Sequence, residues 1–271
     1  MNIHGKEIRA IVSDFDGTII KSGMTKPPAH FYEVIGQALE EGIPFIAASG
    51  RQYGNLQRML SPIAHRINYI CENGCLVIYQ GKVIYKSIFP NRIGQALLAD
   101  MEIYGADRVI VSGEDTSYLL NQNGEFMDYV ANTIGNHITP LSSFTEISEP
   151  IMKISIHFKS GVPKEVASFF HQKYDALLQV TEGGNGWFDF NMKEATKGAA
   201  LTLLAAHMGI STDNMIVFGD NENDVSMFKI AGISYVVSTA SRHVKEYADY
   251  TCDNVEDIIK CHCISSTKRV Q

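Results

Sequence analysis

Apolar and polar positions in the first part of the chain alternate between two patterns, one typical of strands and one typical of helices. Three apolar runs predict buried strands at 8–13, 43–48 and 68–71. Helices are predicted between them, one opening at Pro27-Pro28 and one over 52–60. Strands that alternate with helices in this way indicate a parallel α/β sheet.

The pattern changes after a hairpin that is predicted over 76–85. Between about 88 and 190, neighbouring strands are interrupted by helices, which is typical of an α+β domain with an antiparallel sheet. The predicted helices lie near 91–104, 125–134 and 163–174, and the predicted strands near 108–112, 117–121, 152–158, 177–182 and 187–191.

The alternating pattern returns from Thr196 onward. Helices are predicted up to Gly209 and near 223–230 and 241–247, and strands at 215–218, 233–237 and 250–252. The simplest organisation is a core built from both ends of the chain, with a second domain inserted into it. We therefore predict an α/β core over 1–85 and 191–271 and an inserted α+β domain over 86–190. The polar tail from Ser265 is expected to be loose.

Composition narrows the classes of protein that fit this pattern. The chain has 271 residues, 45% of them hydrophobic and 20% charged, which indicates a folded globular protein. A formal net charge of −7 without a strongly basic block argues against binding to nucleic acid. No apolar run approaches the length of a transmembrane helix, so we expect no membrane association. Five cysteines without a disulfide framework, and an N-terminus unlike a signal peptide, predict the cytoplasm.

Polar residues follow three of the predicted core strands directly. Asp14 follows the strand 8–13, Ser49-Gly50 follows the strand 43–48, and Asp220 follows the strand 215–218. In an open parallel sheet, ligands bind in the crevice beyond the carboxyl ends of the strands. We therefore expect these residues to meet in one crevice. Lys197, at the start of a predicted helix, could join them.

Up to four carboxylates converge on this predicted crevice: Asp14, Asp16, Asp220 and Asp224. Repulsion between close carboxylates would raise their pKa values unless a cation lay among them. Mg²⁺ prefers oxygen ligands and keeps several waters, so a few carboxylates and a phosphate complete its coordination. The cluster therefore predicts a Mg²⁺ site.

The same residues describe a site for phosphoryl transfer. Ser49 precedes a predicted helix whose first N–H groups can bind phosphate oxygens, and Lys197 supplies a positive charge. A carboxylate beside Mg²⁺ can attack phosphorus and form an aspartyl-phosphate. A second carboxylate two residues on can protonate the leaving oxygen and later deprotonate water.

Four motifs in this order resemble those of the haloacid dehalogenase superfamily of phosphatases. "DFDGT" (14–18) matches the first motif, D-x-D-G-T, and "SG" (49–50) matches the second. Lys197 matches the third, and "GDNEND" (219–224) matches the fourth, G-D-x-x-N-D. The resemblance implies a doubly wound parallel-sheet core. The inserted domain looks like the C2-type cap, most like that of the Cof subfamily of sugar-phosphate phosphatases.

The resemblance also implies roles for individual residues. Asp14 would be the nucleophile and a Mg²⁺ ligand, and Asp16 the general acid/base and a ligand through its backbone carbonyl. Asp220 would be the third protein ligand. Asp224 would either bind the metal itself or contact one of the groups that do. The implied phosphate-binding groups are Ser49, Gly50, Lys197, Asn223 and the backbone N–H of Phe15.

Two stretches depart from the family pattern. "CENG" (71–74) resembles an "NGA" stretch of the family, but Cys75 stands where alanine is usual. "VSTAS" (237–241) stands where the family often has "GNA". The second departure leaves open which groups complete that side of the crevice.

Several of these residues also have an ordinary structural interpretation. Ser49 with Gln52 has the spacing of a capping box, Asp224 could cap the helix after it, and Lys197 could be a surface lysine. Their combination favours the functional interpretation. Arg51 either reaches the substrate or pairs with a surface carboxylate.

Three further stretches are expected to be structural. The glycine-rich run at 183–186 lacks a dinucleotide-binding spacing and predicts a loop. Trp187 and Phe188 are predicted to pack in a core rather than to contact substrate. Cys261-His262-Cys263 lacks a second pair of ligands for a zinc site.

The sequence thus predicts a Mg²⁺-dependent phosphatase that acts on a small phosphorylated metabolite as a monomer or weak homodimer. Sugar phosphates are the first expectation, with flavin mononucleotide and pyridoxal phosphate as others. A phosphosugar mutase and a non-catalytic phosphometabolite-binding protein remain alternatives. The intact set of Asp14, Asp16, Lys197 and Asp220 argues against the non-catalytic one.

Overall fold

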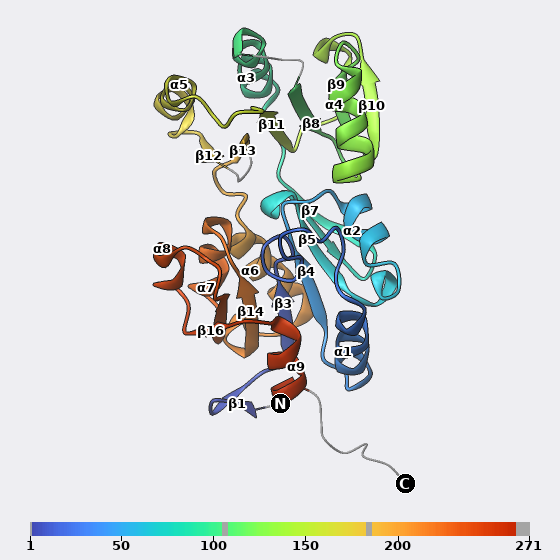
Figure 1. The fold of residues 1–271 in the computed structure, drawn as a ribbon, viewed down its shortest axis with the longest axis vertical. Helices are drawn as coiled ribbons and strands as arrows, with labels where there is room; N and C mark the ends of the chain where they lie inside the picture. Colours follow the sequence, from blue (N-terminus) through green and yellow to red (C-terminus); the bar gives the residue numbers. More distant parts are fainter. Residues whose placement is uncertain (1, 105–107, 183–185, 264–271) are drawn as a thin grey trace. The chain divides into compact units, whose positions relative to one another are not determined.

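The structure is a computed structural model that describes residues 2–104, 108–182 and 186–263 (Figure 1). The chain divides into two compact units: the first contains the residues up to Gly50, Leu56–Ile84 and the residues from Thr196, and the second contains Arg51–Asn55 and Tyr85–Ala195. The second unit extends to Ala195. Its last strand runs to Met192, so the segment after that strand stays with the second unit.

The first unit is built on an eight-stranded sheet, which confirms the predicted α/β class. Six of its strands are parallel, and only β6 is seen to run antiparallel to its neighbour β5. In spatial order the strands are β16 (Tyr250–Cys252), β15 (Ile233–Val237), β14 (Met215–Gly219), β3 (Ala10–Ser13), β4 (Phe45–Ala48), β5 (Asn68–Cys71), β6 (Leu76–Tyr79) and β7 (Lys82–Lys86).

The order of these strands makes the sheet doubly wound. From β3 the chain moves outward through β4 and β5, whereas β14, β15 and β16 move outward in the opposite direction. Because crossovers between parallel strands are right-handed, opposite directions place the connecting helices on opposite faces of the sheet. The direction reverses between β3 and β14, and a crevice forms beyond the strand ends at such a point.

Helices flank this sheet. Of these, α1 packs on β4 and α9, whereas α6 packs on β5, β6 and α7. The helices are α1 (Ala29–Glu40), α2 (Tyr53–Met59), α6 (Lys197–Met208), α7 (Val225–Phe228), α8 (Arg242–Lys245) and α9 (Val255–Cys263). Short 3-10 turns are η1 (Ala64–Arg66), η2 (Glu72–Gly74), η7 (Thr212–Asn214) and η8 (Glu222–Asp224), and a small ribbon pairs β1 (Asn2–Ile3) with β2 (Lys6–Glu7).

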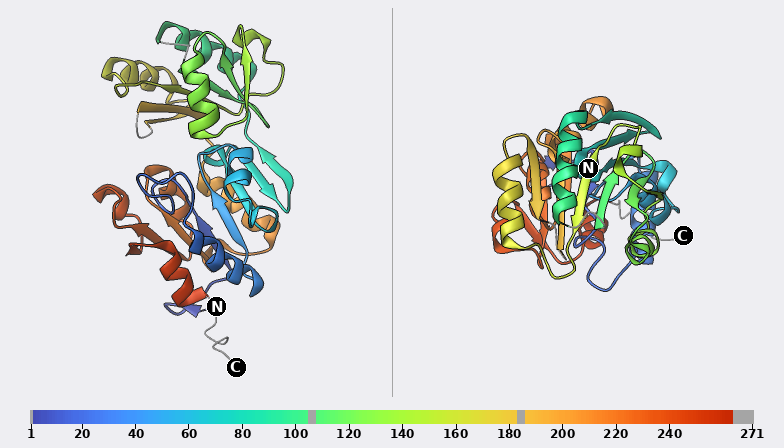
Figure 2. Two further views of the ribbon diagram at one scale, coloured as in Figure 1. Left: turned by 45° about the vertical axis from the view of Figure 1, so that its right-hand side comes forward. Right: turned by 90° about the horizontal axis from the view of Figure 1, so that it is seen from above.

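The second unit contains a six-stranded sheet and three α-helices, seen again in Figure 2. In spatial order its strands are β10 (Ile138–Leu141), β9 (Ser117–Leu120), β8 (Val109–Ser112), β11 (Lys153–His157), β13 (Trp187–Met192) and β12 (Leu178–Glu182). Its helices are α3 (Asn91–Tyr104), α4 (Gly124–Asp128), the π-helix η4 (Tyr129–Ile134), α5 (Lys164–Tyr174) and the 3-10 turn η5 (Phe144–Glu146).

The sheet of the second unit departs from the prediction at one edge. Its pairs are antiparallel, as expected, except that β10 pairs with β9 in parallel. The sequence analysis missed β10 because Pro140 interrupts it, and proline lacks the N–H that a central strand needs. An edge position tolerates that loss.

Some predicted elements differ from the structure in length or type. The predicted helix 125–134 is α4 followed by a π-helix, and the predicted helix 223–230 is a 3-10 turn followed by the four-residue α7. The helix α9 was not predicted, although Val255 and Ile259 form its buried side. Residues 183–185 and the tail from Ser265 lie outside the described residues.

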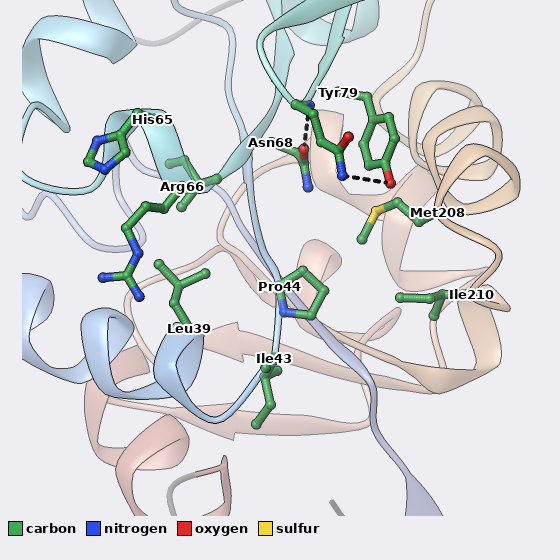
Figure 3. A pocket seen from close by; sticks show the side chains of 12 residues that line it. Leu39, Ile43, Pro44, His65, Arg66, Asn68, Tyr79, Met208 and Ile210 are labelled. Atoms are coloured by element: carbon green, nitrogen blue, oxygen red, sulfur yellow. Dashed lines mark hydrogen bonds between the residues drawn. The ribbon is translucent and has the colours of Figure 1, made fainter.

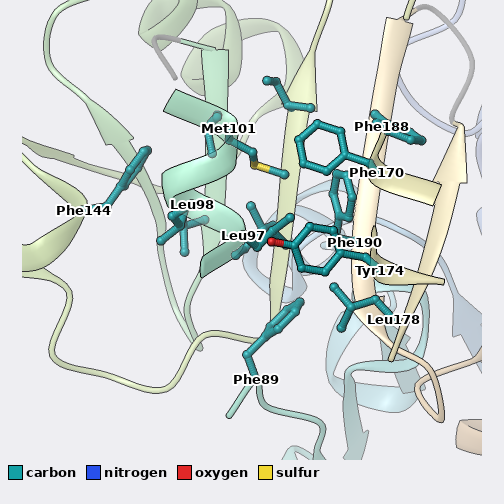
Figure 4. Close-up of a cluster of buried hydrophobic side chains, with 14 of the residues drawn as sticks. Phe89, Leu97, Leu98, Met101, Phe144, Phe170, Tyr174, Leu178, Phe188 and Phe190 are labelled. Atoms are coloured by element: carbon teal, nitrogen blue, oxygen red, sulfur yellow. The ribbon is translucent and has the colours of Figure 1, made fainter. Parts of the chain in front are cut away.

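The core of the second unit is an aromatic cluster (Figure 4). The Phe170 ring lies 5.0 Å from the Phe190 ring and 5.9 Å from the Phe188 ring in edge-to-face contacts, a favourable arrangement. Phe188 is fully buried, as predicted from the sequence. Trp187 packs against a separate small cluster beside α4. Among the described residues, no helix has both the length and the apolar character required to span a membrane.

Two helical glycines should respond in opposite ways to alanine. In α6, a Cβ at Gly198 would lie 2.3 Å from the Ser226 carbonyl oxygen, so Gly198→Ala must push α6 away from α7. In α1, a Cβ at Gly36 would meet nothing within 4 Å. We expect Gly198→Ala to lower the free energy of unfolding by about 1–3 kcal/mol. We expect Gly36→Ala to raise it by about 1 kcal/mol, because alanine is the better helix former.

Urea denaturation of the two variants beside the wild-type chain measures both changes. A Gly198→Ala variant as stable as Gly36→Ala would contradict the described contact between α6 and α7.

Candidate active site

The carboxyl ends of neighbouring strands in the first unit place three polar residues at one edge of the sheet. Asp14 follows β3, Ser49 follows β4 and Asp220 follows β14. The backbone N–H of Asp14 donates to the Phe218 carbonyl at 3.0 Å, which ties the ends of β3 and β14 together. These are the two strands between which the winding reverses, so Asp14 and Asp220 flank the crevice that this topology creates.

Lys197 lies among these strand ends. It is the first residue of α6, and the Thr196 hydroxyl caps that helix by accepting from the Ala199 N–H at 3.1 Å. The Lys197 side chain is fully buried, and its Nζ donates to Asp14 Oδ1 and to Asp224 Oδ1, each at 2.7 Å. Burial alone would lower the pKa of Lys197, but the two carboxylates raise it above its usual range. Lys197 is therefore a charged ammonium inside the protein and not a surface lysine.

Asp14 combines burial with an unsatisfied oxygen. Burial raises the pKa of Asp14 well above its usual range, nearby carboxylates raise it further, and the Lys197 ammonium opposes both effects. Oδ1 accepts from Lys197, whereas Oδ2 has no hydrogen-bond partner among the described residues. A buried anionic oxygen without a partner is costly, so the site favours a ligand that supplies positive charge.

Asp220 is held by the loop that follows Asp14. The Thr18 hydroxyl donates to Asp220 Oδ1 at 3.0 Å. Gly17 has φ +94°, and a Cβ there would lie 2.1 Å from Asp220 Oδ2. The Gly-Thr pair after the first two aspartates therefore lets this loop approach Asp220. Burial, and then the charge of Asp224, raise the pKa of Asp220 to about 6.

Asp224 organises the loop after β14. Its Oδ2 accepts from the backbone N–H groups of Asp220 and Asn221 at 3.0 and 3.1 Å, and its Oδ1 accepts from Lys197. With Asn221 it forms the capping box of η8. The capping interpretation of Asp224 therefore holds together with its place in the site.

The carboxylates form a group that suits a hard cation. One oxygen from each of Asp14, Asp220 and Asp224 can be chosen so that all three lie within 4.8 Å of one another. Carboxylate oxygens are the ligands that Mg²⁺ prefers, and the unsatisfied Asp14 oxygen lies in this group. Asp16 lies on the same loop, where it is exposed and forms a backbone bridge with Ile20. The residues present therefore fit a divalent metal ion.

A turn after β5 connects the residues that were predicted to bind phosphate. The Ser49 carbonyl accepts from the Asn73 N–H at 3.1 Å, and Asn73 Oδ1 accepts from Asn223 Nδ2 at 2.9 Å. A Cβ at Gly50 would lie 2.9 Å from that same Asn73 oxygen. Ser49, Gly50 and Asn223 are thus grouped around Asn73.

The sequence analysis gave Asn73 no role in the site. Its backbone lies in the left-handed region, with φ 59° and ψ 23°. Asn and Gly are the residues that enter this region most readily. The Asn-Gly pair at 73–74, one residue beyond the end of a parallel strand, was the signal that could have identified a tight turn into the crevice.

Two predictions about the loop after β4 need correction or completion. The helix α2 begins at Tyr53, so Ser49 is not its N-cap and the expected capping box is not formed. The Gln52 side chain instead accepts from the His137 N–H at 3.1 Å within the second unit. Arg51 donates to Asn55 Oδ1 at 3.1 Å.

The Phe15 ring packs in the core, 5.9 Å from the Phe31 ring, so only its backbone is available to a ligand.

A cavity of about 460 Å³ lies elsewhere in the first unit (Figure 3). It is bordered by Pro44 and Asn68, which stand at the amino ends of β4 and β5. Asp14 and Asp220 follow the opposite ends of their strands, so this cavity is separate from the site described above. None of the candidate-site residues lines this cavity, so we do not assign it as the active site.

Known proteins resemble this chain over most of its length. The family described as haloacid dehalogenase-like hydrolase matches residues 11–258. The chain is 25% identical to the 5-amino-6-(5-phospho-D-ribitylamino)uracil phosphatase of Escherichia coli over 90% of each chain. It is 24% identical to the pyridoxal phosphate phosphatase of Escherichia coli, over 94% of this chain and 99% of that protein.

Solved structures show the same fold. A haloacid dehalogenase-like hydrolase from Bacteroides thetaiotaomicron aligns with a TM-score of 0.82 at 23% identity, over 94% of this chain and 99% of that one. A sugar phosphatase of haloacid dehalogenase subclass IIB aligns with a TM-score of 0.80 at 24% identity, over 93% and 98%. The match of the family to most of the chain shows that the protein belongs to the haloacid dehalogenase-like hydrolases and is a phosphatase of that family.

Proposed function

We propose that this phosphatase depends on Mg²⁺ and hydrolyses small phosphate monoesters through an aspartyl-phosphate on Asp14. The observation that carries the proposal is the state of the Asp14 carboxylate. Lys197 fixes one of its oxygens at 2.7 Å, and the other is buried without a partner among the described residues. A nucleophile needs this combination of a fixed orientation and an available oxygen.

The proposed reaction has two steps. An Asp14 oxygen attacks phosphorus, the bond to the leaving oxygen breaks, and Asp16 donates a proton to that oxygen. Asp16 then takes a proton from water, which attacks the phosphorus of the aspartyl-phosphate and releases inorganic phosphate with Asp14 restored. Asp16 suits proton exchange because it is exposed, unlike the buried Asp14.

Two sets of groups would offset the negative charge of the phosphoryl oxygens: a metal ion and the protein's own hydrogen-bond donors. Asp14, Asp220 and the Asp16 carbonyl would hold Mg²⁺, which when bound neutralises charge on the phosphoryl oxygens. Both Asp224 oxygens already accept hydrogen bonds, Oδ1 from Lys197 and Oδ2 from backbone N–H groups. We therefore propose that Asp224 positions Lys197 and the loop after β14 and does not bind the metal. Lys197, Ser49, Gly50, Asn223 and the Phe15 N–H would bind the phosphoryl oxygens, with Asn73 orienting Asn223.

The proposed substrate is a small phosphorylated metabolite. The names of the relatives give a ribitylaminouracil phosphate, pyridoxal phosphate and sugar phosphates as what those proteins act on. We assign the first unit as the catalytic core and the second as a cap that excludes water and selects the leaving group. Four cysteines, Cys71, Cys75, Cys252 and Cys261, form no disulfide, which fits the reducing cytoplasm that we propose. We expect a monomer or weak homodimer.

Release of phosphate from a panel of phosphorylated metabolites and p-nitrophenyl phosphate, with Mg²⁺ or with EDTA, tests this function. We expect release that requires Mg²⁺. Release at the same rate in EDTA would contradict the metal requirement. Conversion of a phosphosugar to its isomer, with little free phosphate, would favour the mutase.

The variant Asp14→Asn tests the nucleophile. Asparagine keeps the volume of Asp14 and can still accept from Lys197, which retains Asp224 as an ionic partner. We therefore expect a folded protein whose kcat is lower by about four orders of magnitude. Circular dichroism checks the fold and phosphate release checks the rate. A variant that keeps a tenth of the wild-type rate would rule out Asp14 as the nucleophile.

The variant Asp220→Asn tests the metal site without relying on activity. A ligand that binds only the folded state raises the melting temperature. We expect Mg²⁺ to raise that of the wild-type chain by a few degrees and that of Asp220→Asn by less than about one degree. The matched control is Asp253→Asn, which removes an exposed carboxylate of the same unit. If Asp220→Asn responds to Mg²⁺ like this control, Asp220 is not a ligand.

A further inference from the structure

The cavity of Figure 3 is formed by four segments of the first unit that are distant in sequence. They are the end of α1 with the loop to β4, η1 with the start of β5, the turn between β6 and β7, and the end of α6. All of the lining residues belong to the first unit, so the cavity is complete within that unit. Its volume of about 460 Å³ lies within the range of small-molecule sites, roughly 300–1,000 Å³.

One part of the lining is apolar. Leu39, Pro44, Met208 and Ile210 come from three of these segments, and each is only partly buried. Their side chains therefore leave apolar surface open to the cavity. Covering such surface is favourable, so the lining favours a ligand with an apolar body.

The polar part of the lining contains a donor that the protein does not use. Asn68 is 7% exposed, and its Oδ1 accepts from the Gln80 N–H at 3.0 Å. Because only the oxygen of an amide side chain can accept, this bond identifies the other atom as Nδ2. Nδ2 has no hydrogen-bond partner among the described residues. Polar groups this deeply buried nearly always have a partner, so a ligand or a water molecule must accept from Nδ2.

Two more donors border the same cavity. The Tyr79 hydroxyl accepts from Gln80 Nε2 at 3.2 Å, so its own proton remains available to an acceptor. Arg66 is exposed and has no ion pair in the part of the chain that the structure describes. The lining also contains His65 but no Asp or Glu, although the chain as a whole has a net charge of −7. A guanidinium without an anion suits a carboxylate, which it can bind through two parallel hydrogen bonds.

We propose that this cavity is a second ligand site, which binds a small organic carboxylate with an apolar body. The carboxylate accepts from Arg66, Asn68 and Tyr79, and the apolar body packs on the apolar part of the lining. The site lies at the amino ends of β4 and β5, whereas Ser49 follows the carboxyl end of β4. The inference goes beyond the proposed phosphatase function and does not depend on it.

Fluorine NMR with two probes of nearly equal size tests the proposal. One is 4-(trifluoromethyl)benzoate, which carries a carboxylate, and the other is 4-(trifluoromethyl)benzamide, which is uncharged. The affinity of each probe for the wild-type chain is measured with and without saturating inorganic phosphate and Mg²⁺, which occupy the proposed active site.

Two variants remove donors from the cavity. Arg66→Gln removes the guanidinium at an exposed position. Asn68→Asp keeps an acceptor for the Gln80 N–H and replaces the Nδ2 donor with a negatively charged oxygen. Arg9→Gln, at an exposed position of the same unit outside the cavity, is the matched control. Arg66→Gln keeps the test decisive if Asn68→Asp fails to fold.

We expect the carboxylate to bind the wild-type chain at least about tenfold more tightly than the amide, because hydrogen bonds to an ionised acceptor are the stronger ones. Arg66→Gln should weaken binding of the carboxylate about tenfold and change binding of the amide by less than about twofold. Asn68→Asp should weaken binding of the carboxylate at least as much, because its added negative charge repels the probe. Arg9→Gln should match the wild-type chain with both probes, and inorganic phosphate should not displace the carboxylate.

Other outcomes would overturn the proposal. Equal affinities for the two probes would show that the cavity does not select an anion. Binding of the carboxylate that Arg66→Gln leaves unchanged, or that inorganic phosphate abolishes, would place the probe outside the cavity. Absence of carboxylate binding up to about 10 mM would show that water alone satisfies the donors. Because these experiments measure binding, they give the same answer whether or not the chain hydrolyses phosphate esters.

Discussion

The buried ammonium of Lys197 between Asp14 and Asp224 is the interaction on which the site depends. Three charged groups at this depth are tolerated only because they compensate one another, and removing one partner of such a group typically costs about 3–5 kcal/mol. The group joins three segments of the candidate site, since Asp14 follows β3, Asp224 lies in the loop after β14 and Lys197 begins α6. These segments must therefore be aligned correctly for the buried charges to pair, and the pairing in turn holds the segments in place.

Close backbone packing supports this arrangement. Gly17 lets the loop after β3 approach Asp220, and a Cβ at Gly219 would lie 2.6 Å from the Asp224 side chain. The left-handed turn at Asn73 brings a side-chain oxygen to Gly50 and Asn223. The carboxylates of the candidate site are thus held by short loops on a parallel sheet, which is the preorganisation that the proposed mechanism requires.

Much of this could be predicted because strand ends in a parallel sheet converge at one edge. The positions of Asp14, Ser49 and Asp220 followed from apolar runs and from the residue directly after each run. Asn73 could not be assigned in this way, because its role arises from a left-handed turn and from a contact with Asn223, which is distant in sequence. The strand β10 was hidden by Pro140, and α9 by the shortness of its apolar stripe. The unsatisfied amide oxygens of Gln179 and Asn191 depend on strand register, which periodicity alone does not determine.

The most direct test of the central claim is to trap the phosphorylated enzyme during turnover and reduce it with borohydride. Reduction converts an aspartyl-phosphate to homoserine, which peptide mass spectrometry locates in the sequence. The mechanism predicts homoserine at position 14 in the presence of substrate and Mg²⁺, and none without substrate. Turnover that leaves position 14 unmodified, or that modifies another aspartate, would contradict a mechanism in which Asp14 is the nucleophile.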